Sequence, residues 1–248
     1  MAGQCVAVVS GKGGTGKTSF TAGVGSALAL AGRRVLCLDC DISLRNLDLA
    51  LGLTDRALMD FTDVAQGRCT LEDAAVEHPK IPGLFLLTAP VRIRGRPVSE
   101  KQMSALLRDI RERYDFCFLD APAGLGSGFQ LAACAADRAV VVTTTDTSSL
   151  RDAQHTVMEL QRFPSGALHL VVNRVRRKML RQLHATIDDA IDRAGLPLLG
   201  VVPEDDALTL SLNQGIPLPL TGNQGAAAAY RNIAKRLQGQ KASLMRIR

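Results

Sequence analysis

The chain has 248 residues, which is ample for one large core, and no uninterrupted apolar run approaches the roughly 18 residues that a bilayer-spanning helix requires. No linker, repeat or low-complexity tract divides it, so we expect one domain over residues 1–238 and a basic tail over residues 239–248. The net charge of +6 favours an anionic partner, which DNA or a membrane surface could supply.

Apolar runs of strand length alternate with helical patterns along the chain. The runs lie at 4–10, 34–39, 84–87, 116–120, 139–144, 168–173 and 198–202, and the helical patterns include 19–31, 99–114, 148–162 and 178–194. Near-continuous apolar runs are typical of parallel strands buried on both faces. We therefore expect an α/β fold with a doubly wound, mostly parallel sheet, helices on both faces, and ligands at the carboxyl ends of the strands.

The first strand begins within a few residues of Met1, which leaves no room for a signal peptide. The six cysteines mostly lie in or beside apolar runs, as reduced thiols do in proteins of the cytoplasm. The expected compartment is therefore the cytoplasm.

The segment after the first strand matches the phosphate-binding pattern G-x-x-x-x-G-K-[ST] at every position. Glycines let the backbone fold around an anion with its N–H groups turned inward, and the lysine supplies an ammonium for the β- and γ-phosphates. The threonine that follows offers a hydroxyl to Mg²⁺. The expected nucleotide-binding residues of this loop are Gly11, Lys12, Gly13, Gly14, Thr15, Gly16, Lys17, Thr18 and Ser19.

A second lysine, Lys12, stands near the start of this loop. One interpretation is a solvated side chain. The run from Lys12 to Thr18 also resembles the deviant Walker A motif of the ParA/MinD family of P-loop ATPases. That resemblance implies an ATP-dependent homodimer in which Lys12 reaches the partner's phosphates. A generic P-loop kinase, the alternative from another class, would leave Lys12 without a role.

The second strand leads into a dense polar segment, residues 39–48. Asp39 and Asp41 lie two apart and share a face in extended backbone, so one carboxylate could hold the water shell of Mg²⁺ while the other orients the attacking water. The segment resembles switch I of the MinD branch more than that of ParA proteins. The resemblance implies that Asp41 is the hydrolytic residue and that Arg45 and Asn46 bind partners. A solvated acidic turn is the alternative.

A later apolar strand ends in Asp120, which is followed by Ala121-Pro122-Ala123-Gly124. A carboxylate placed in this way can reach Mg²⁺ through water or through Thr18, as a Walker B aspartate does. The expected metal ligands are thus Thr18, Asp41 and Asp120, and the expected catalytic residues are Lys12, Lys17, Asp41 and Asp120. Helix capping is the alternative role for Asp120.

Two segments after late strands match the elements that hold the adenine base in the family. They are Asn173 with Arg174, and Pro203 with Glu204 and Asp205. Helix capping by Asn173 and a simple strand end at Pro203 are the alternatives. The segment 148–152 also resembles the family, which implies that Asp152 binds a partner. Together the matches cover residues 4 to about 238.

The resemblance implies a switch ATPase of the MinD branch, which uses ATP and Mg²⁺ to position the division septum and works with MinC-like or MinE-like regulators. A ParA-like partitioning ATPase bound to DNA is an alternative, for which the basic run Arg174, Arg176, Arg177, Lys178 and Arg181 is the candidate contact. A solvated helix face explains the same run. A flagellar-number regulator of the FlhG type is a further alternative within the family.

The chain closes with a short basic segment, residues 241–248. Relatives of the MinD branch end in an amphipathic helix on anionic membrane, which implies a peripheral location at the inner face of the cell membrane in the ATP-bound state. In a helix Leu244, Met245 and Ile247 would share one arc, but Lys241 and Arg248 would fall inside it. A frayed basic tail is the alternative.

Overall fold

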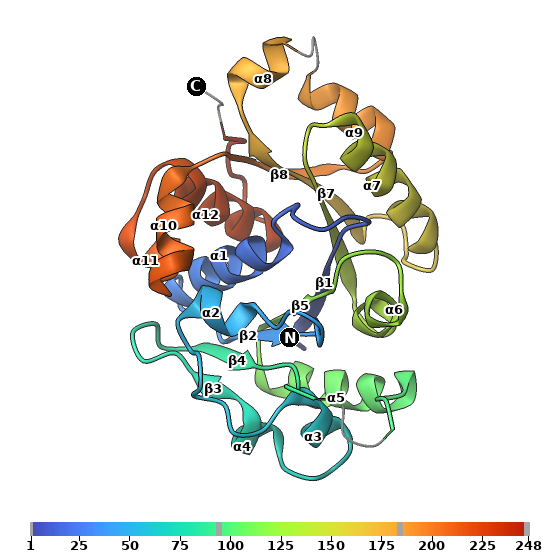
Figure 1. Ribbon diagram of the computed structural model, residues 1–248, viewed down its shortest axis with the longest axis vertical. Helices are drawn as coiled ribbons and strands as arrows, with labels where there is room; N and C mark the ends of the chain where they lie inside the picture. The colour runs from blue at the N-terminus through green and yellow to red at the C-terminus, as the bar shows by residue number, and fades with distance from the viewer. Residues whose placement is uncertain (1, 93–95, 183–185, 246–248) are drawn as a thin grey trace.

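The computed structural model describes residues 2–92, 96–182 and 186–245. Its centre is one eight-stranded sheet in the order β3-β4-β2-β5-β1-β6-β7-β8, parallel throughout except between β3 and β4 (Figure 1). This confirms the doubly wound, mostly parallel sheet expected from the sequence. The strands are β1 (Gln4–Val9), β2 (Val35–Asp39), β3 (Val76–Glu77), β4 (Leu84–Leu87), β5 (Phe116–Asp120), β6 (Arg138–Thr143), β7 (Leu168–Val175) and β8 (Leu198–Pro203).

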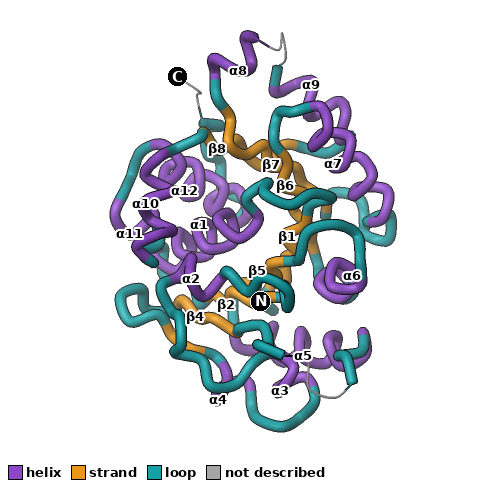
Figure 2. The backbone as a smooth tube through the Cα atoms, viewed as in Figure 1, coloured by secondary structure: helices purple, strands orange, loops and turns teal. Residues whose placement is uncertain are grey.

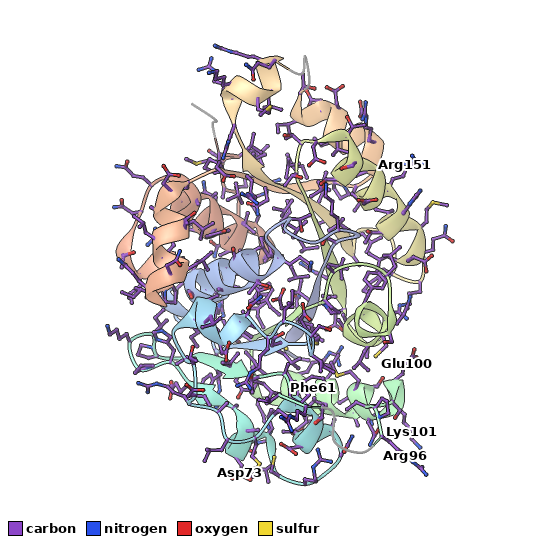
Figure 3. The ribbon with its side chains drawn as sticks, viewed as in Figure 1. Phe61, Asp73, Arg96, Glu100, Lys101 and Arg151 are labelled. Atoms are coloured by element: carbon purple, nitrogen blue, oxygen red, sulfur yellow. The ribbon has the colours of Figure 1, made fainter. Side chains whose placement is uncertain are left out.

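Helices cover both faces of the sheet, as Figure 2 shows. One face is covered by α1 (Lys17–Leu30), α2 (Leu47–Leu51), α10 (Asp206–Gln214), α11 (Leu218–Thr221) and α12 (Gly225–Leu237). The other is covered by α3 (Phe61–Ala65), α4 (Leu71–Ala74), α5 (Glu100–Arg113), α6 (Ser127–Ala133), α7 (Thr147–Glu159) and α9 (Ile187–Ala194). Each layer packs on its own hydrophobic cluster. In Figure 3, Phe61 points from α3 into the interior, whereas the exposed Arg151 points outward from α7.

The central strands β2 and β5 are buried at every position, because helices exclude water from both of their faces. Their register places Asp39 directly opposite Asp120 at the carboxyl ends of the two strands. Asp120 also pairs with Val8 of β1, the strand that leads into the phosphate loop. The acidic residues and the loop therefore meet at one edge of the sheet.

Helix starts differ in a way that bears on function. Helices α3, α4, α5 and α9 begin with a capping box, in which a side chain satisfies free backbone N–H groups. Helix α1 begins after Gly16 without any side-chain cap. Its first-turn N–H groups are thus left for another acceptor, which suits an anion.

Close packing fixes α1 against the rest of the fold. A Cβ atom at Gly23 would lie 2.3 Å from the ring of Tyr230 in α12, so only glycine fits there. The ring of Tyr230 also contacts Phe20 edge to face, with centroids 6.5 Å apart. These contacts hold the helix that follows the phosphate loop.

Before the C-terminal segment, the structure differs from the expected elements in two places. The helical pattern at 178–194 forms two helices, α8 (Arg177–Gln182) and α9, because Thr186 is extended and caps α9. Residues 183–185 of that pattern lie outside the described residues. The short antiparallel strand β3 is absent from the prediction, since two residues carry no periodicity.

The C-terminal segment forms no helix over residues 240–245, and Arg246, Ile247 and Arg248 lie outside the described residues. Met245 instead packs against the cluster beside α12 and β8, while Leu244 stays 43% exposed. The expected amphipathic helix is therefore not present in the part that is described. Within residues 2–92, 96–182 and 186–245, no helix has the length and apolarity needed to cross a membrane.

Candidate nucleotide-binding site

The loop from Gly11 to Thr18 joins β1 to α1, as the sequence predicts. Gly14 and Gly16 have φ angles of 78° and 93°, in the left-handed region that favours glycine. A Cβ atom at Gly16 would also lie 2.2 Å from the amide nitrogen of Asn173, and one at Gly11 would lie 2.7 Å from the carbonyl oxygen of Asp152. The backbone of the loop is thus packed closely against β7 and α7.

Lys17 is buried within this site, with its Nζ 2.9 Å from Ser10 Oγ. Burial lowers the pKa of Lys17, although the nearby Asp120 and Asp41 act to raise it. A desolvated ammonium among carboxylates gains from a further anion close by. Lys17 is therefore placed to bind a phosphate group.

Thr18 donates a hydrogen bond of 2.6 Å from Oγ1 to Asp120 Oδ2. Burial, together with repulsion from Asp39, raises the pKa of Asp120 to about 8. Its other oxygen, Oδ1, is buried and accepts no hydrogen bond within the described residues. A buried carboxylate with a free oxygen beside a hydroxyl fits a hard cation such as Mg²⁺.

The two aspartates after β2 lie in different surroundings. Asp41 lines the cavity, and its Oδ1 accepts hydrogen bonds from the backbone of Ser43 and Leu44 at 3.0 and 3.1 Å. Asp39 is fully buried and accepts from the N–H groups of Asp41 and Leu47 at 2.8 and 3.2 Å. Burial raises the pKa of Asp39 to about 7. Asp39 therefore secures the start of α2, and Asp41 rather than Asp39 lines the cavity; a role of either carboxylate toward Mg²⁺ stays a prediction.

The residues expected to bind partners lie around this site. Asn46 is exposed and lines the cavity. Arg45 has a left-handed φ of 43°, and its Nε lies 3.4 Å from Asp48 Oδ2. Asp152 lies on α7 beside Gly11. Their role toward partners stays a prediction.

Asn173 is buried at the end of β7, where its Nδ2 donates to the carbonyl oxygen of Thr15 at 2.8 Å. Its Oδ1 accepts no hydrogen bond within the described residues. Because α8 begins only at Arg177, Asn173 does not cap that helix. It lines the cavity with an unused acceptor, which suits an amino group such as that of adenine.

The second base-side segment is built around helix starts. Pro203 is the last residue of β8. The carboxylate of Asp205 accepts from the N–H of Ala207 at 3.0 Å and from that of Ala226 at 2.8 Å. Asp205 therefore secures the starts of α10 and α12, which leaves its backbone as the group near a base.

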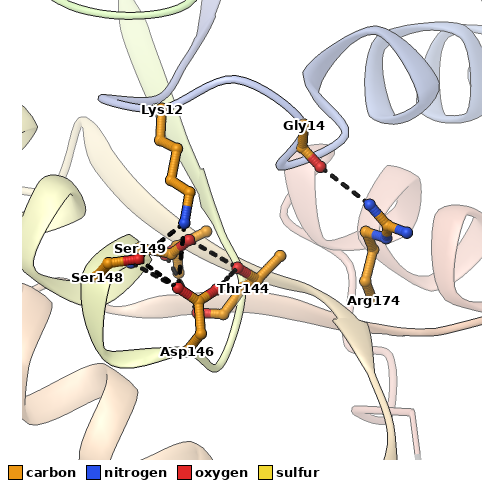
Figure 4. Close-up of polar contacts among 8 residues, drawn as sticks. Lys12, Gly14, Thr144, Asp146, Ser148, Ser149 and Arg174 are labelled. Atoms are coloured by element: carbon orange, nitrogen blue, oxygen red, sulfur yellow. Dashed lines mark hydrogen bonds and ion pairs between the residues drawn. The ribbon is translucent and has the colours of Figure 1, made fainter.

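Arg174 makes three hydrogen bonds with its guanidinium, of which Figure 4 shows the one to Gly14. Two reach the carboxylate of Glu204 at 3.0 and 3.2 Å, and the third reaches the carbonyl oxygen of Gly14 at 3.2 Å. Arg176 also contacts Glu204, at 3.3 Å. Two cations of the basic run are thus paired within the chain.

Lys12 lies on the other side of the phosphate loop from the cavity. Its Nζ lies 3.2 Å from Asp146 Oδ1 and 2.8 Å from Ser148 Oγ (Figure 4). These contacts place it in a groove of about 610 Å³ that is bounded by the phosphate loop, by the turn into α7 and by the segment that holds Arg174 and Arg176. Lys12 and Lys17 therefore face opposite sides of one loop.

These elements enclose a cavity of about 370 Å³ that runs from the phosphate loop to α10. Several lining residues are absent from the sequence predictions, namely Leu44, Ala121, Ala123, Leu208, Thr209 and Leu212. Leu208 and Leu212 are spaced i, i+4 directly after the base-side segment, and that spacing could have identified them. They provide an apolar wall of the kind that a planar base requires.

Comparisons with known proteins agree with this geometry. The family described as CobQ/CobB/MinD/ParA nucleotide binding domain matches residues 6–218. The septum site-determining protein MinD of Synechocystis sp. is 38% identical over 240 residues, which are 96% of this chain and 90% of that protein.

Two solved structures extend the likeness to three dimensions. The MinC:MinD cell division protein complex of Aquifex aeolicus matches with a TM-score of 0.90 at 34% identity, covering 98% of this chain and 99% of that one. MinD from Pyrococcus horikoshii, complexed with Mg-ADP, matches with a TM-score of 0.83 at 30% identity, covering 94% and 95%. The resemblance inferred from the sequence is confirmed, and the ParA-like and FlhG-like alternatives are not favoured. The chain therefore belongs to the CobQ/CobB/MinD/ParA family of nucleotide-binding ATPases and, within it, to the septum site-determining MinD type.

Proposed function

We propose that this chain is a Mg²⁺-dependent ATPase that acts as an ATP-driven dimeric switch in placing the division septum. The observation that carries the proposal is the opposite placement of two lysines on one loop. Lys17 lines the cavity, whereas Lys12 faces a groove toward α7. Lys12 is thus directed away from the chain's own nucleotide, and once it leaves Asp146 and Ser148 it can reach the nucleotide of a second copy.

Different residues of the cavity bind the phosphates, the metal and the base of ATP. Lys17 and the uncapped N–H groups at the start of α1 bind the phosphates. Thr18 and Asp120 hold Mg²⁺, which would neutralise charge on the β- and γ-phosphates. Asn173 and the backbone around Pro203 meet the base against Leu208 and Leu212. The Mg-ADP in the Pyrococcus horikoshii relative supports this assignment.

Hydrolysis is assigned to Asp41. Its carboxylate lines the cavity beside the phosphate loop and is anchored by two backbone N–H groups, so it is positioned to orient an attacking water. The same hydrogen bonds tie it to the segment that carries Arg45 and Asn46. A change at the γ-phosphate would therefore move that segment, which is the property required of a switch.

The proposed partners are protein regulators, inferred from the family, and an anionic surface, inferred from the basic segments of the chain. The MinC:MinD complex of a relative supports a MinC-like regulator, and a MinE-like activator is a parallel proposal. We place the ATP-bound dimer at the inner face of the cell membrane through its basic tail. For the DNA alternative, all five cations of the run are exposed, and Arg174 and Arg176 are paired with Glu204, whereas Arg177, Lys178 and Arg181 form no ion pair within the described residues.

The test is the mass of the purified protein in light scattering, with ADP or with ATP and Mg²⁺. An Asp41→Ala background suppresses hydrolysis, and in it ATP should convert monomer to dimer. Adding Lys12→Ala should block the conversion while nucleotide binding persists. A monomer mass with ATP in the Asp41→Ala background would overturn the dimeric switch.

A further inference from the structure

Two consecutive residues at the end of β7 bind two consecutive carbonyl groups of the phosphate loop. Asn173 donates to the carbonyl oxygen of Thr15 at 2.8 Å, and Arg174 donates to that of Gly14 at 3.2 Å. The sequence predicts base contacts for both residues. The structure shows that both also bind the phosphate loop.

We propose that Arg174, held by Glu204, is a positioning residue that presets the phosphate loop for anion binding. A trans peptide is planar, with its C=O and N–H on opposite sides. Holding the Gly14 carbonyl toward Arg174 therefore turns the N–H of Thr15 to the other side, and holding the Thr15 carbonyl does the same for the N–H of Gly16. These N–H groups belong to the stretch that the loop pattern assigns to phosphate contact.

Glu204 fixes the orientation of the Arg174 guanidinium. Its Nε and one terminal nitrogen form a two-pronged contact with Glu204, which leaves the other terminal nitrogen for Gly14. Such a fork restricts rotation about the last side-chain bonds. The third hydrogen bond is thus directed at one carbonyl.

The backbone at Arg174 supports a functional reason for this arrangement. Its φ of 55° is left-handed, which is uncommon outside glycine. The pairing of β7 with β8 shifts register between Val172 and Val175 and resumes where the N–H of Glu204 donates to Val175 at 3.1 Å. Arg176 contacts Glu204 without reaching the loop and without a positive φ, so the ion pair alone does not require the strain.

This inference rests on the proposed nucleotide binding and makes a separate prediction. A residue that contacts the base would affect adenosine and ADP alike. A residue that positions the loop would affect ADP and ATP only, because adenosine has no phosphate. Arg174→Ala removes the contact with the Gly14 carbonyl, and Arg174→Lys keeps part of it. Arg176→Ala is the matched control.

The experiment measures dissociation constants for ADP and ATP by titration calorimetry, and for adenosine by competition at millimolar concentration. Arg174→Ala should lower the affinity for ADP and for ATP by about 3- to 10-fold, the range for one hydrogen bond, and leave the affinity for adenosine unchanged. Arg174→Lys should recover part of the loss, and Arg176→Ala should stay within about two-fold. Hydrogen exchange over residues 11–18 without nucleotide should accelerate in Arg174→Ala and not in Arg176→Ala.

A further variant separates positioning from structural support. Arg174→Gly relieves the left-handed strain, so it should melt at a higher Tm than Arg174→Ala and bind ADP equally weakly. Unchanged ADP affinity and loop exchange in Arg174→Ala would overturn the inference, as would an equal loss of adenosine affinity. Failure of the unaltered chain to bind ADP or ATP would instead overturn the proposed function.

Discussion

Lys12 Nζ lies 3.2 Å from Asp146 Oδ1 of the same chain. The lysine that is proposed to act on a second copy is therefore bound by an ion pair within its own chain. Asp146 is well suited to hold it. Partial burial acts to raise the pKa of Asp146, but hydrogen bonds from Thr144, Ser148 and Ser149 outweigh this and keep that pKa well below its usual range. The carboxylate therefore stays charged, and dimerisation has to break its contact with Lys12.

The first prediction is that Asp146→Asn promotes dimerisation. Asparagine keeps the cap that Asp146 provides to the N–H of Ser149, but it loses the charge that attracts Lys12. Both side chains of the pair are about half exposed, so each contact is worth about 0.5 kcal/mol, and a dimer breaks two. The midpoint of ATP-dependent dimerisation should fall about five-fold in protein concentration, as measured by analytical ultracentrifugation.

Salt provides the control for that prediction. High ionic strength screens the exposed pair in the original chain, so the difference between the two proteins should shrink as salt increases. A midpoint that moves upward in Asp146→Asn would show that Asp146 supports the dimer rather than restraining Lys12.

The second prediction separates binding from hydrolysis. Asp41→Ala should keep ATP affinity and lose turnover on the order of 100-fold, because its carboxylate orients water in the proposed mechanism. Lys17→Ala should lower the affinity for ATP by about 10- to 100-fold through loss of a charged hydrogen bond. Calorimetry and a phosphate-release assay measure the two effects, and a large affinity loss in Asp41→Ala would move that residue into the metal site.

The sequence predicted those features that depend on local pattern. Buried parallel strands read as apolar runs, and the phosphate loop has a fixed spacing of glycines from Gly11 to Thr18. Both were therefore located within a residue or two. The placement of Asp120 opposite the loop also followed, since carboxyl ends of parallel strands share an edge.

The contacts between segments distant in sequence could not be predicted in this way. Asp39 and Asp41 look equivalent in the sequence, but the start of α2 folds back on Asp39 and removes it from the cavity. Arg174 looks like a base contact until Glu204 and Gly14 are seen on either side of it. Tertiary packing, rather than local propensity, decided these roles.

The third prediction concerns pH. Burial raises the pKa of Asp39 to about 7 and that of Asp120 to about 8, from an ordinary 3.8. Between pH 4 and 8 the folded protein therefore holds more protons than the unfolded chain, so the free energy of unfolding should fall as pH rises, by an amount on the order of a few kcal/mol. Denaturant titrations from pH 5 to 8 without nucleotide or Mg²⁺ measure this slope.

Asp120→Asn removes one of the two carboxyls and should flatten that profile, with greater stability at pH 8 than the original chain. Mg²⁺ added at pH 8 should recover part of the lost stability in the original chain and not in the variant. Stability that increases from pH 5 to 8 would contradict the raised pKa values.

The last prediction concerns the tail. Met245 packs beside Gly200 and Ile233, so a tail that enters a membrane has to leave this contact first. A few apolar side chains at about 1.5 to 3 kcal/mol each, discounted for shallow insertion, give weak attachment, and two copies in a dimer roughly double its free energy.

We expect the 248-residue chain to sediment with anionic liposomes only with ATP and Mg²⁺, and not with zwitterionic ones. Deleting residues 240–248 should abolish this while basal hydrolysis stays unchanged. Equal sedimentation of the truncated protein would remove the tail from membrane binding, and ATP-dependent retention on DNA instead would favour the ParA-like alternative.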